Sequence, residues 1–427
     1  MKNLNEFREQ INIIDKQIAS LFEERMKLSA DIAEYKKKNN LDIFDKKREE
    51  EVIRRNIELI QDENLKEYYQ NLLIYLMNLS KQYQNKLIND NEVITVNTSS
   101  TKYDIILKKN SLNDIDKYFY LHRKVFVIVE DKIPQSYVDL ITSKCLYPVI
   151  YRLNVSEKIK TLSTCKQIWD LMLENEFNRH DCLISCGGGI IGDVGGFVAS
   201  TYMRGIDFYN IPTTVLSQVD SSIGGKTAIN FGGYKNIIGS FYSPQKVLID
   251  LRFLDSLDKR QINNGLVEAL KMSILCDKEL FEIFENNTYL HDMQKVIYRS
   301  LLNKRKIIEY DEKEKGIRKI LNFGHTIGHG IEALNIGLYH GECVALGMLA
   351  LCSDEIYDKL LPIYKLLNLP QKIDFDSDKV IKNIMHDKKS TDDGIEIIFV
   401  NDIEKYEIKK VNIDYLYNRL ELIKRGR

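Results

Sequence analysis

The sequence predicts a multidomain protein in which an all-helical segment is followed by an α/β segment and then by a second, helical segment. Three observations predict this order. The first 88 residues contain neither glycine nor proline, because all 22 glycines lie at Gly187 or later and the first proline is Pro134. Short β-branched runs alternate with helical patterns in the middle of the chain, and helical periodicity returns beyond about residue 255. The length of 427 residues also exceeds what one hydrophobic core usually supports.

The first segment predicts three helices. Apolar residues recur at helical spacing from Phe7 to Leu28, and similar patterns run from about Lys46 to Ile60 and from about Asn64 to Leu87. The polar interval 89–102 indicates a linker or the entry to the next domain. The predicted domains are residues 1–90, 91–255 and 256–427.

The middle segment predicts a parallel sheet. Short apolar runs at Lys124 to Val129 and Cys182 to Cys186 have the composition of buried strands, and a helical pattern lies between them at about Lys166 to Glu176. Beyond it the expected helices run from Gln261 to Leu275, from Tyr289 to Tyr310 and from His325 to Leu360.

A glycine-rich run, Gly187 to Asp193, follows the second of these strands and has the spacing Gly-x-Gly-x-x-Gly. Glycines at such a turn allow a pyrophosphate to approach backbone N–H groups at a helix start. An ordinary tight strand-to-helix turn is the alternative. The run lies about ninety residues into its domain, which disfavours an ordinary Rossmann domain.

Three of the seven histidines lie within sixteen residues, at His325, His329 and His340. The first two are separated by four positions, so both rings lie on one face if the segment is helical. Imidazole is a common zinc ligand, and the cluster therefore predicts a metal site. A helix that carries two unrelated polar residues is the alternative.

Composition excludes several classes of function. The 61 basic and 62 acidic residues nearly cancel, which argues against nucleic-acid binding and favours small-molecule partners. The seven cysteines form no Cys-x-x-Cys pair and favour a reducing compartment. Charges at Lys2, Glu6 and Arg8 argue against a signal peptide, and no apolar run reaches the length of a membrane span. We therefore expect a cytoplasmic protein without a membrane partner.

Further motifs follow the glycine-rich run in one order. They are Ser200 to Gly205, Pro212 to Thr214, Asp220 to Thr227, Lys235 to Asn236 and Asn263 to Lys271. Together with the glycines and the histidines, these motifs resemble 3-dehydroquinate synthase over about residues 92 to 427. The resemblance implies an α/β nucleotide-binding domain followed by an all-α metal- and substrate-binding domain. It also implies NAD and a divalent metal, zinc or cobalt, as cofactors.

The reaction implied by the resemblance converts 3-deoxy-arabino-heptulosonate 7-phosphate, a sugar-acid phosphate, into 3-dehydroquinate and phosphate. It proceeds by transient oxidation, elimination of phosphate, reduction, ring opening and aldol closure. The implied metal ligands are Glu268, His325 and His340. His329, a second ligand by spacing alone, matches instead a residue for substrate contact and proton transfer, and Glu314 matches the other proton-transfer residue. Lys226 is the third catalytic residue that we expect.

Cations and amides are expected around this substrate, because it carries both a carboxylate and a phosphate. The resemblance implies substrate contacts from Arg204, Asp220, Lys226, Asn236, Lys271, Lys304, Arg318, Asn322, His325, His340 and Lys388. It implies NAD contacts from Asp131, Glu157, Lys160, Gly188, Gly189, Asp193, Thr213, Thr214, Lys235 and Asn264.

The first 88 residues resemble the all-helical chorismate mutase in eight polar positions. These are Arg8, Arg25, Lys36, Asp45, Arg48, Glu49, Ser80 and Gln84. The resemblance implies that all eight bind chorismate, with Lys36 and Gln84 acting at the ether oxygen as its bond breaks to form prephenate. A plain amphipathic helical hairpin is the alternative.

Helical geometry agrees with this resemblance. The eleven-residue step from Arg25 to Lys36 returns to within about 20° of the same face, whereas Arg8 lies about a quarter turn away from Arg25. In the family, the arginine that Arg8 matches reaches the active site of the partner subunit. We therefore expect a homodimer.

The sequence thus predicts a bifunctional enzyme of aromatic amino-acid biosynthesis. Two rival hypotheses remain. In the first, the chain is another sugar-phosphate cyclase, whose substrate lacks the carboxylate. In the second, it is a synthase whose helical domain only senses chorismate or prephenate. The cations at Lys304 and Arg318 argue against the first rival, and turnover of chorismate discriminates the second.

Overall fold

The computed structural model describes residues 3–38, 46–89, 92–387 and 394–426. Contacts within the chain divide it into two compact units, Met1–Glu92 and Val93–Arg427. The second unit contains both the α/β part and the helical part that follows it. The domain limits expected near residues 90 and 255 stay predictions.

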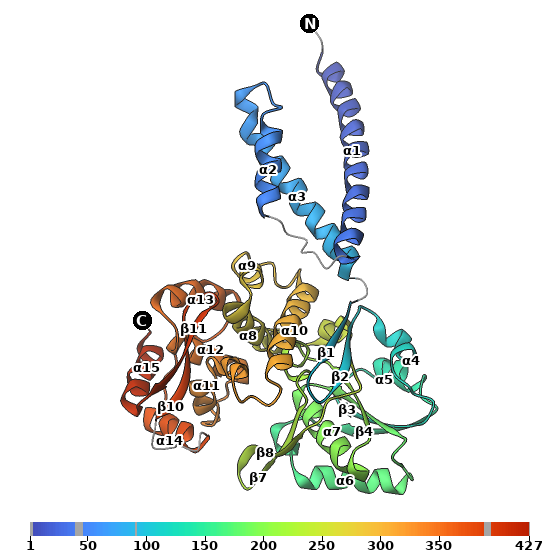
Figure 1. Cartoon of the computed structure of the whole chain (residues 1–427), viewed down its shortest axis with the longest axis vertical. Coiled ribbons are helices and arrows are strands. Elements are labelled where there is room, and N and C mark those ends of the chain that lie inside the picture. The colour runs from blue at the N-terminus through green and yellow to red at the C-terminus, as the bar shows by residue number, and fades with distance from the viewer. Residues whose placement is uncertain (1–2, 39–45, 90–91, 388–393, 427) are drawn as a thin grey trace. The chain divides into compact units, whose positions relative to one another are not determined.

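The first unit is helical (Figure 1). It consists of α1 (Leu4–Lys38), α2 (Lys46–Ile57) and α3 (Lys66–Asn89), and a short 3-10 turn precedes α3. Helix α3 packs against both α1 and α2. The absence of helix breakers explains the length of α1, which continues ten residues beyond the periodic segment that ends at Leu28.

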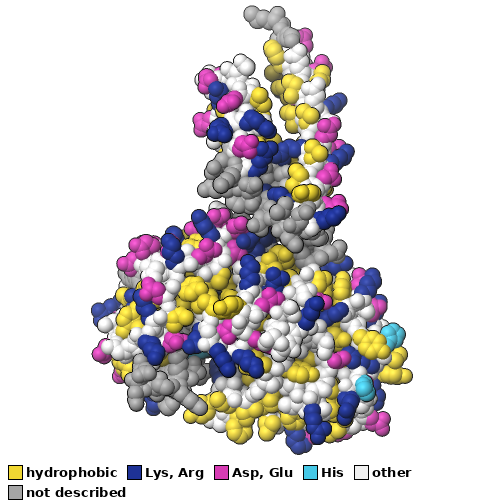
Figure 2. All heavy atoms as spheres, viewed as in Figure 1, with side chains coloured by type: hydrophobic (Ala, Val, Ile, Leu, Met, Phe, Trp, Pro, Cys, Tyr) yellow, Lys and Arg dark blue, Asp and Glu magenta, His cyan; other side chains and the backbone are white. Residues whose placement is uncertain are grey.

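Helix α1 carries an exposed apolar stripe. Phe7, Ile11, Ile14, Ile18 and Leu21 recur at helical spacing and are 49 to 64% exposed. Figure 2 shows hydrophobic side chains along this helix. The periodicity therefore predicts the helix correctly, but these side chains are not buried within the described part of the chain. An exposed apolar stripe of this length is typical of an interaction surface.

The second unit is built on a seven-stranded sheet, within the residues that the structure describes. Its strand order is β1-β2-β9-β6-β5-β3-β4, and the pairs β2-β9, β9-β6, β6-β5, β5-β3 and β3-β4 are parallel. The polar interval 89–102 contains the first strand, so it is the entry to this domain. The strands are β1 (Glu92–Asn97), β2 (Lys102–Leu107), β3 (Lys124–Glu130), β4 (Tyr147–Leu153), β5 (Cys182–Gly187), β6 (Asp207–Pro212) and β9 (Lys246–Ile249).

Helices cover both faces of this sheet (Figure 1). Alternate side chains of a strand point to opposite faces, so Val127 of β3 packs with α4 (Ile115–Tyr118) and α5 (Gln135–Thr142). Phe126 faces the other way, toward α6 (Leu162–Glu174) and α7 (Gly189–Thr201). Burial on both faces explains why β3 and β5 are continuous apolar runs.

A separate hairpin follows β6. It consists of β7 (Lys226–Phe231) and β8 (Tyr234–Phe241), which pair antiparallel. The turn between them is formed by Gly232 and Gly233, whose φ angles of 60° and 85° favour glycine.

The C-terminal part is mainly helical, which confirms the predicted order of segments. The expected stretch from His325 to Leu360 is divided among three helices. The first break contains Asn335 and Gly337, where φ is positive, and the second lies between Ala350 and Asp354. Two strands that the pattern did not predict also pair here. The elements are α8 (Lys259–Cys276), α9 (Lys278–Glu285), α10 (Met293–Tyr310), α11 (His325–Glu332), α12 (His340–Ala350), α13 (Asp354–Leu366), α14 (Ser377–Asp387), β10 (Ile395–Asp402), β11 (Lys405–Val411) and α15 (Ile413–Arg425).

The sheet edge and the helical part share one hydrophobic core. Ile94 and Ile105 of the first two strands lie in the same buried cluster as Leu266 of α8 and Leu346 of α12. This shared core holds the helices that carry the histidines beside the sheet. Among the described residues, no helix is both long enough and apolar enough to cross a membrane.

Candidate functional site

Three of the expected cofactor residues lie at the carboxyl edge of the sheet. Asp131 follows β3, Gly188 follows β5 and Thr213 follows β6, and these three strands are neighbours. Two backbone bonds mark this edge: Asp131 N donates to Leu153 O at 2.9 Å, and Thr213 N donates to Gly187 O at 3.0 Å. Ligands of open parallel sheets bind at this edge, where the strand order reverses.

Two glycines leave space at the start of α7. A Cβ atom on Gly188 would lie 3.3 Å from Cγ2 of Thr214, and one on Gly189 would lie 3.0 Å from Oγ of Ser221. Both contacts are tighter than usual for a Cβ atom. The free N–H groups of the first helical turn lie in the same place, so the turn fits a bound pyrophosphate.

A buried lysine joins this edge to the β7-β8 hairpin. The ammonium group of Lys160, which is 3% exposed, donates to Oδ2 of Asp193 at 2.7 Å and also to Oδ1 of Asn236. Nearby, Asn230 Nδ2 donates to Oε1 of Glu157 at 2.8 Å. Burial raises the pKa of Asp193, and the Lys160 ammonium group opposes that rise. The structure therefore brings together three expected NAD residues and one expected substrate residue.

The histidine cluster is closed by a buried carboxylate from α8. Glu268 is 1% exposed, and its Oε1 lies 3.6 Å from Nε2 of His325 and 3.7 Å from Nε2 of His340. Lys271 Nζ lies 2.5 Å from the other oxygen, yet neither oxygen has a hydrogen bond of acceptable geometry among the residues that the structure describes. A buried carboxylate in this state is satisfied by a cation, and histidine with carboxylate is a ligand set of zinc and similar ions.

The third histidine lies in the same cluster. One nitrogen from each of His325, His329 and His340 lies within 4.8 Å of the others. The ring centroids of His325 and His329 are 5.2 Å apart, as expected from their four-residue spacing on α11. The geometry alone therefore does not separate a ligand role of His329 from a proton-transfer role.

Glu332 is a residue of this site that the sequence prediction missed. Its carboxylate lies 2.9 Å from Nδ1 of His340 and 2.8 Å from Nζ of Lys235. Burial raises the pKa of Glu332, but these two partners outweigh burial and hold the pKa well below its usual range. A helical signal was available, because Glu332 lies two turns after His325 on α11 and thus on the same face.

Buried cations lie near the histidine cluster. Lys271, Lys304 and Arg318 are between 2 and 6% exposed. Nζ of Lys304 lies 2.9 Å from Oδ1 of Asp220 and also donates to the backbone oxygen of Asp220 at 2.6 Å. Burial lowers the pKa of Lys304 to about 8, although Asp220 partly offsets this effect. Three buried cations with two nearby carboxylates, those of Glu268 and Asp220, favour an anionic ligand.

Glu314 lies in the loop after α10 and contacts two other expected site residues. Its carboxylate accepts from the ammonium group of Lys226 and, at 2.9 Å, from Nδ2 of Asn322. Burial raises the pKa of Glu314, but Lys226 and Asn322 outweigh it, so the pKa is lowered. At φ 57° the backbone of Glu314 is in the left-handed region, so the loop itself has to be held in place.

Two acidic residues hold this loop, and the sequence prediction missed both. Asp311 accepts from three backbone N–H groups of the loop, at Lys315, Gly316 and Arg318, with distances of 2.7 to 3.0 Å. Glu312 accepts from Ser99 Oγ at 2.6 Å, in the turn between β1 and β2. The sequence did carry a signal for both residues, because two adjacent acidic residues stand next to a glycine-containing loop.

Several expected residues are not brought into this network. Arg204 is exposed and has no side-chain hydrogen bond or ion pair within the described part of the chain. Asp131 is exposed as well. Asn264 is buried, and its Oδ1 accepts from Gly341 N at 2.6 Å, next to His340. Lys388 lies outside the described residues.

The helical unit brings together part of its expected set. Nη1 of Arg25 donates to Ser80 Oγ at 3.2 Å, and Ser80 also bonds the hydroxyl of Ser29. Gln84, one turn after Ser80, is 7% exposed, and its buried Oε1 has no hydrogen-bond partner in the described part of the chain. Glu49 pairs with Lys81 at 2.9 Å. This end of α1 and α3 therefore presents donors and a buried acceptor to a small polar ligand.

The other expected residues of the helical unit lie elsewhere or carry other contacts. Arg8 is exposed and precedes Arg25 by 17 residues, which corresponds to about 26 Å along α1. Lys36 is half-buried on the same helix, and Arg48 pairs with Glu51 at 2.7 Å. Asp45 lies outside the described residues.

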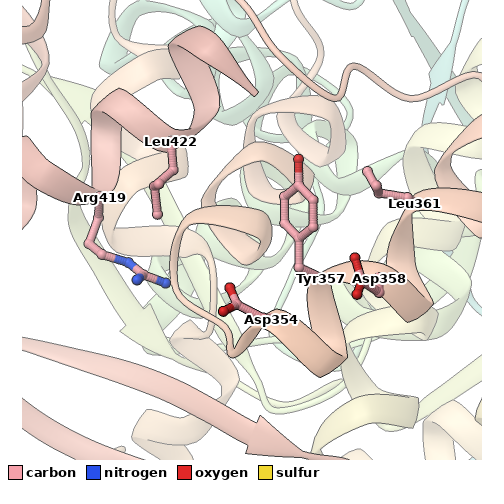
Figure 3. A pocket seen from close by; sticks show the side chains of 6 residues that line it. All are labelled: Asp354, Tyr357, Asp358, Leu361, Arg419 and Leu422. Atoms are coloured by element: carbon pink, nitrogen blue, oxygen red, sulfur yellow. The ribbon is translucent and has the colours of Figure 1, made fainter. Parts of the chain in front are cut away.

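A surface pocket of about 660 Å³ opens between α13 and α15 (Figure 3). Its lining residues are Asp354, Tyr357, Asp358, Leu361, Arg419 and Leu422. Arg419 is held by the backbone oxygen of Cys352 at 2.8 Å, so it serves the packing of α15. None of the expected site residues that the structure describes lines this pocket.

Comparison with known proteins matches each part of the chain to a family. Residues 150–264 match the N-terminal part of 3-dehydroquinate synthase, and residues 265–390 match its C-terminal part. Residues 7–85 match chorismate mutase type II. The 3-dehydroquinate synthase of Clostridium beijerinckii is 35% identical over 348 residues, which cover 76% of this chain and 99% of that relative.

Solved structures establish the fold of the second unit. A 2-deoxy-scyllo-inosose synthase complexed with carbaglucose-6-phosphate, NAD+ and Co2+ has a TM-score of 0.71 and 24% identity, covering 79% of this chain and 100% of that chain. The 2-epi-5-epi-valiolone synthase of Streptomyces hygroscopicus, with NAD+ and Zn2+ bound, has a TM-score of 0.70 and 23% identity, covering 76% of this chain and 97% of that chain.

The fold and the site define an α/β enzyme whose sheet edge faces an appended helical part with a histidine cluster beside a buried carboxylate. The chain belongs to the 3-dehydroquinate synthase family, and it carries a chorismate mutase type II domain at residues 7–85. Both resemblances inferred from the motifs are confirmed. The roles of the individual site residues stay predictions.

Proposed function

We propose that the chain catalyses two reactions of the shikimate pathway. Its second unit converts 3-deoxy-arabino-heptulosonate 7-phosphate into 3-dehydroquinate and phosphate, with NAD and a divalent metal. Its helical unit rearranges chorismate to prephenate. The observation that carries the first activity is the group of buried cations, Lys271, Lys304 and Arg318, beside the cluster of Glu268 and the histidines.

Three buried cations favour a substrate with more than one anionic group. A cyclase whose substrate lacks the carboxylate would bring fewer anionic groups to these cations. Arg318 and Asn322 lie next to the Glu314 loop, and Lys304 lies at Asp220. The proposed substrate has a carboxylate and a phosphate to occupy these groups.

The site residues fit both cofactors. Glu268, His325 and His340 would hold zinc or cobalt, because the buried Glu268 oxygens find no hydrogen bond of acceptable geometry within the described ranges. Gly188, Gly189 and the start of α7 would hold the NAD pyrophosphate. When bound, NAD accepts and returns a hydride, and the metal polarises the substrate oxygen at the carbon being oxidised.

The remaining residues bind and move protons. Glu314 is held as a carboxylate by Lys226 and Asn322, which suits a proton acceptor at its Oε atoms. His329 lies among the proposed metal ligands, but its own role in this proposal is proton transfer and substrate contact. Asp311 holds the conformation of the short segment that carries Glu314 and Arg318, so that both side chains can reach the same substrate.

The mutase reaction needs neither a nucleophile nor a metal. It needs fixed cations for two carboxylates and donors for the ether oxygen as its bond breaks. Arg25 with Ser80 and the buried amide of Gln84 support such a site, with Lys36 about three turns further along the same face of α1. The Nε2 group of the Gln84 side chain would donate to the ether oxygen of the substrate.

A homodimer completes this site in our proposal. Arg8 lies about 26 Å along α1 from Arg25, so one chain does not aim both at one chorismate. A second copy packed on the exposed apolar stripe of α1 would bury Phe7, Ile11 and Leu21 and deliver its own Arg8 to this site.

Two assays on the purified full chain test the proposal. The first measures phosphate release from 3-deoxy-arabino-heptulosonate 7-phosphate with NAD and zinc, and the second measures loss of chorismate. His340→Ala is expected to abolish only the first activity and Arg25→Ala only the second, so each variant is the folding control for the other. Phosphate release from a hexose 6-phosphate instead would identify another sugar-phosphate cyclase. Chorismate binding without turnover would identify a sensing domain.

A further inference from the structure

A chain of three side chains crosses the site from the β7-β8 hairpin to the histidine cluster. Lys235 Nζ lies 2.8 Å from Oε1 of Glu332, and Oε2 of Glu332 lies 2.9 Å from Nδ1 of His340. The other nitrogen of His340, Nε2, lies 3.7 Å from Oε1 of Glu268. Both oxygens of Glu332 are thus engaged, each by a different partner.

This geometry determines which nitrogen of His340 is free. A hydrogen bond from Nδ1 to a carboxylate keeps the proton on Nδ1, so the lone pair of a neutral imidazole lies on Nε2. Nε2 is the nitrogen that faces Glu268. The bond also fixes the rotation of the ring, which matters because His340 is the first residue of α12 and follows a connection with positive φ at Asn335 and Gly337.

We propose that Glu332 is a positioning residue for the metal site. It holds the His340 ring with Nε2 directed toward Glu268, and Lys235 in turn holds Glu332. Neither acts on the substrate. The inference rests on the proposed function, because it takes His340 to be a metal ligand, and it gives Lys235 a role in addition to the expected NAD contact.

A nearby acid provides a matched control. Glu342 lies ten residues after Glu332, at the start of α12, and its carboxylate pairs with Arg260 at 2.7 Å and accepts from Tyr339 N at 2.8 Å. It supports the same helix start through Arg260 and Tyr339 rather than through a histidine. A loss of metal affinity that arises only from a weakened start of α12 would therefore appear in a Glu342 variant as well.

The experiment measures Co2+ affinity of the full chain by competition with a chelator, together with the visible absorption spectrum of the bound Co2+. Glu332→Ala is expected to weaken affinity by between about 10-fold and 100-fold and to change the spectrum. Glu332→Gln should lose less Co2+ affinity, because the glutamine amide oxygen still accepts from Nδ1 of His340. Lys235→Met should give a smaller loss than Glu332→Ala, and Glu342→Gln should retain the wild-type affinity and spectrum.

A parallel His340→Ala variant distinguishes a failure of the metal-ligand assignment from a failure of the positioning role. If His340→Ala keeps wild-type Co2+ affinity, the metal-ligand assignment in the proposed function fails. If His340→Ala loses Co2+ but Glu332→Ala and Glu332→Gln both bind it as the wild type does, the positioning role is overturned while the ligand assignment stands. An equal loss in Glu342→Gln would also overturn it. Should Glu332→Ala fail to fold, the comparison of Glu332→Gln with Glu342→Gln decides.

Discussion

The ammonium group of Lys226 lies against the carboxylate of Glu314, although 88 positions separate the two residues in the chain. Lys226 begins strand β7, and Glu314 lies in the loop after α10. The contact joins the hairpin to the helical part at the site. It also sets the protonation state of Glu314, because Lys226 is the largest of the groups that lower its pKa against the effect of burial.

Replacing this lysine should shift the pH dependence of the synthase. In Lys226→Met the pKa of Glu314 rises toward its usual value or above it, because burial is no longer opposed by the ammonium group. A proton acceptor works above its pKa, so the acidic limb of the kcat/KM profile should move to higher pH as the rate falls. Lys313→Met, an exposed lysine next to Glu314, is the control and should leave the limb in place. An unmoved limb in Lys226→Met would show that Glu314 does not govern it.

The roles of the two histidines on α11 should differ. His325→Ala removes a proposed ligand and should release the metal, whereas His329→Ala should keep the metal and lose most phosphate release. Elemental analysis after gel filtration measures the bound metal, and the phosphate assay measures turnover. Equal metal loss in both variants would favour the simple interpretation of the His-x-x-x-His spacing, in which His329 is a ligand.

The mutase site should be shared between two chains. Arg8→Ala and Arg25→Ala should each abolish chorismate turnover, and mixing them under conditions of subunit exchange should restore part of it, because one of the two sites in a mixed dimer has both native arginines. Recovery stays partial because the other site lacks both. Mixed dimers that form, as shown by differently tagged chains, and yet remain inactive would place both arginines in one chain's site.

The close approach of α11 and α12 should be sensitive to a single methyl group. A Cβ atom on Gly347 would lie 1.9 Å from the backbone oxygen of Gly324, so alanine would push apart the helices that carry His325 and His340. Gly347→Ala should destabilise the second unit by about 1–3 kcal/mol and weaken metal binding. Urea unfolding followed by fluorescence of Trp169, the chain's one tryptophan, reports this unit. Gly316→Ala is the control, because the nearest atom there is 3.6 Å away. Equal stability of the two variants would contradict the expected clash.

Local pattern determined much of this protein from the sequence alone. The helical spacing of apolar residues predicted α1, the β-branched runs predicted β3 and β5, and the glycine-rich run predicted the turn into α7. The motifs also identified both families correctly. Each of these signals depends on neighbours within a few turns or one strand, where backbone conformation and side-chain direction are set by spacing.

Tertiary structure decided what the site contains. No spacing places Glu268 beside His325, Lys304 beside Asp220, or Glu332 between Lys235 and His340, because these contacts join residues of different elements. The apolar stripe of α1 shows the same limit: its period predicts a helix but not whether the chain buries that face. Burial and pairing depend on which elements the shared core packs together, and that choice is made by the sum of long-range contacts rather than by any local pattern.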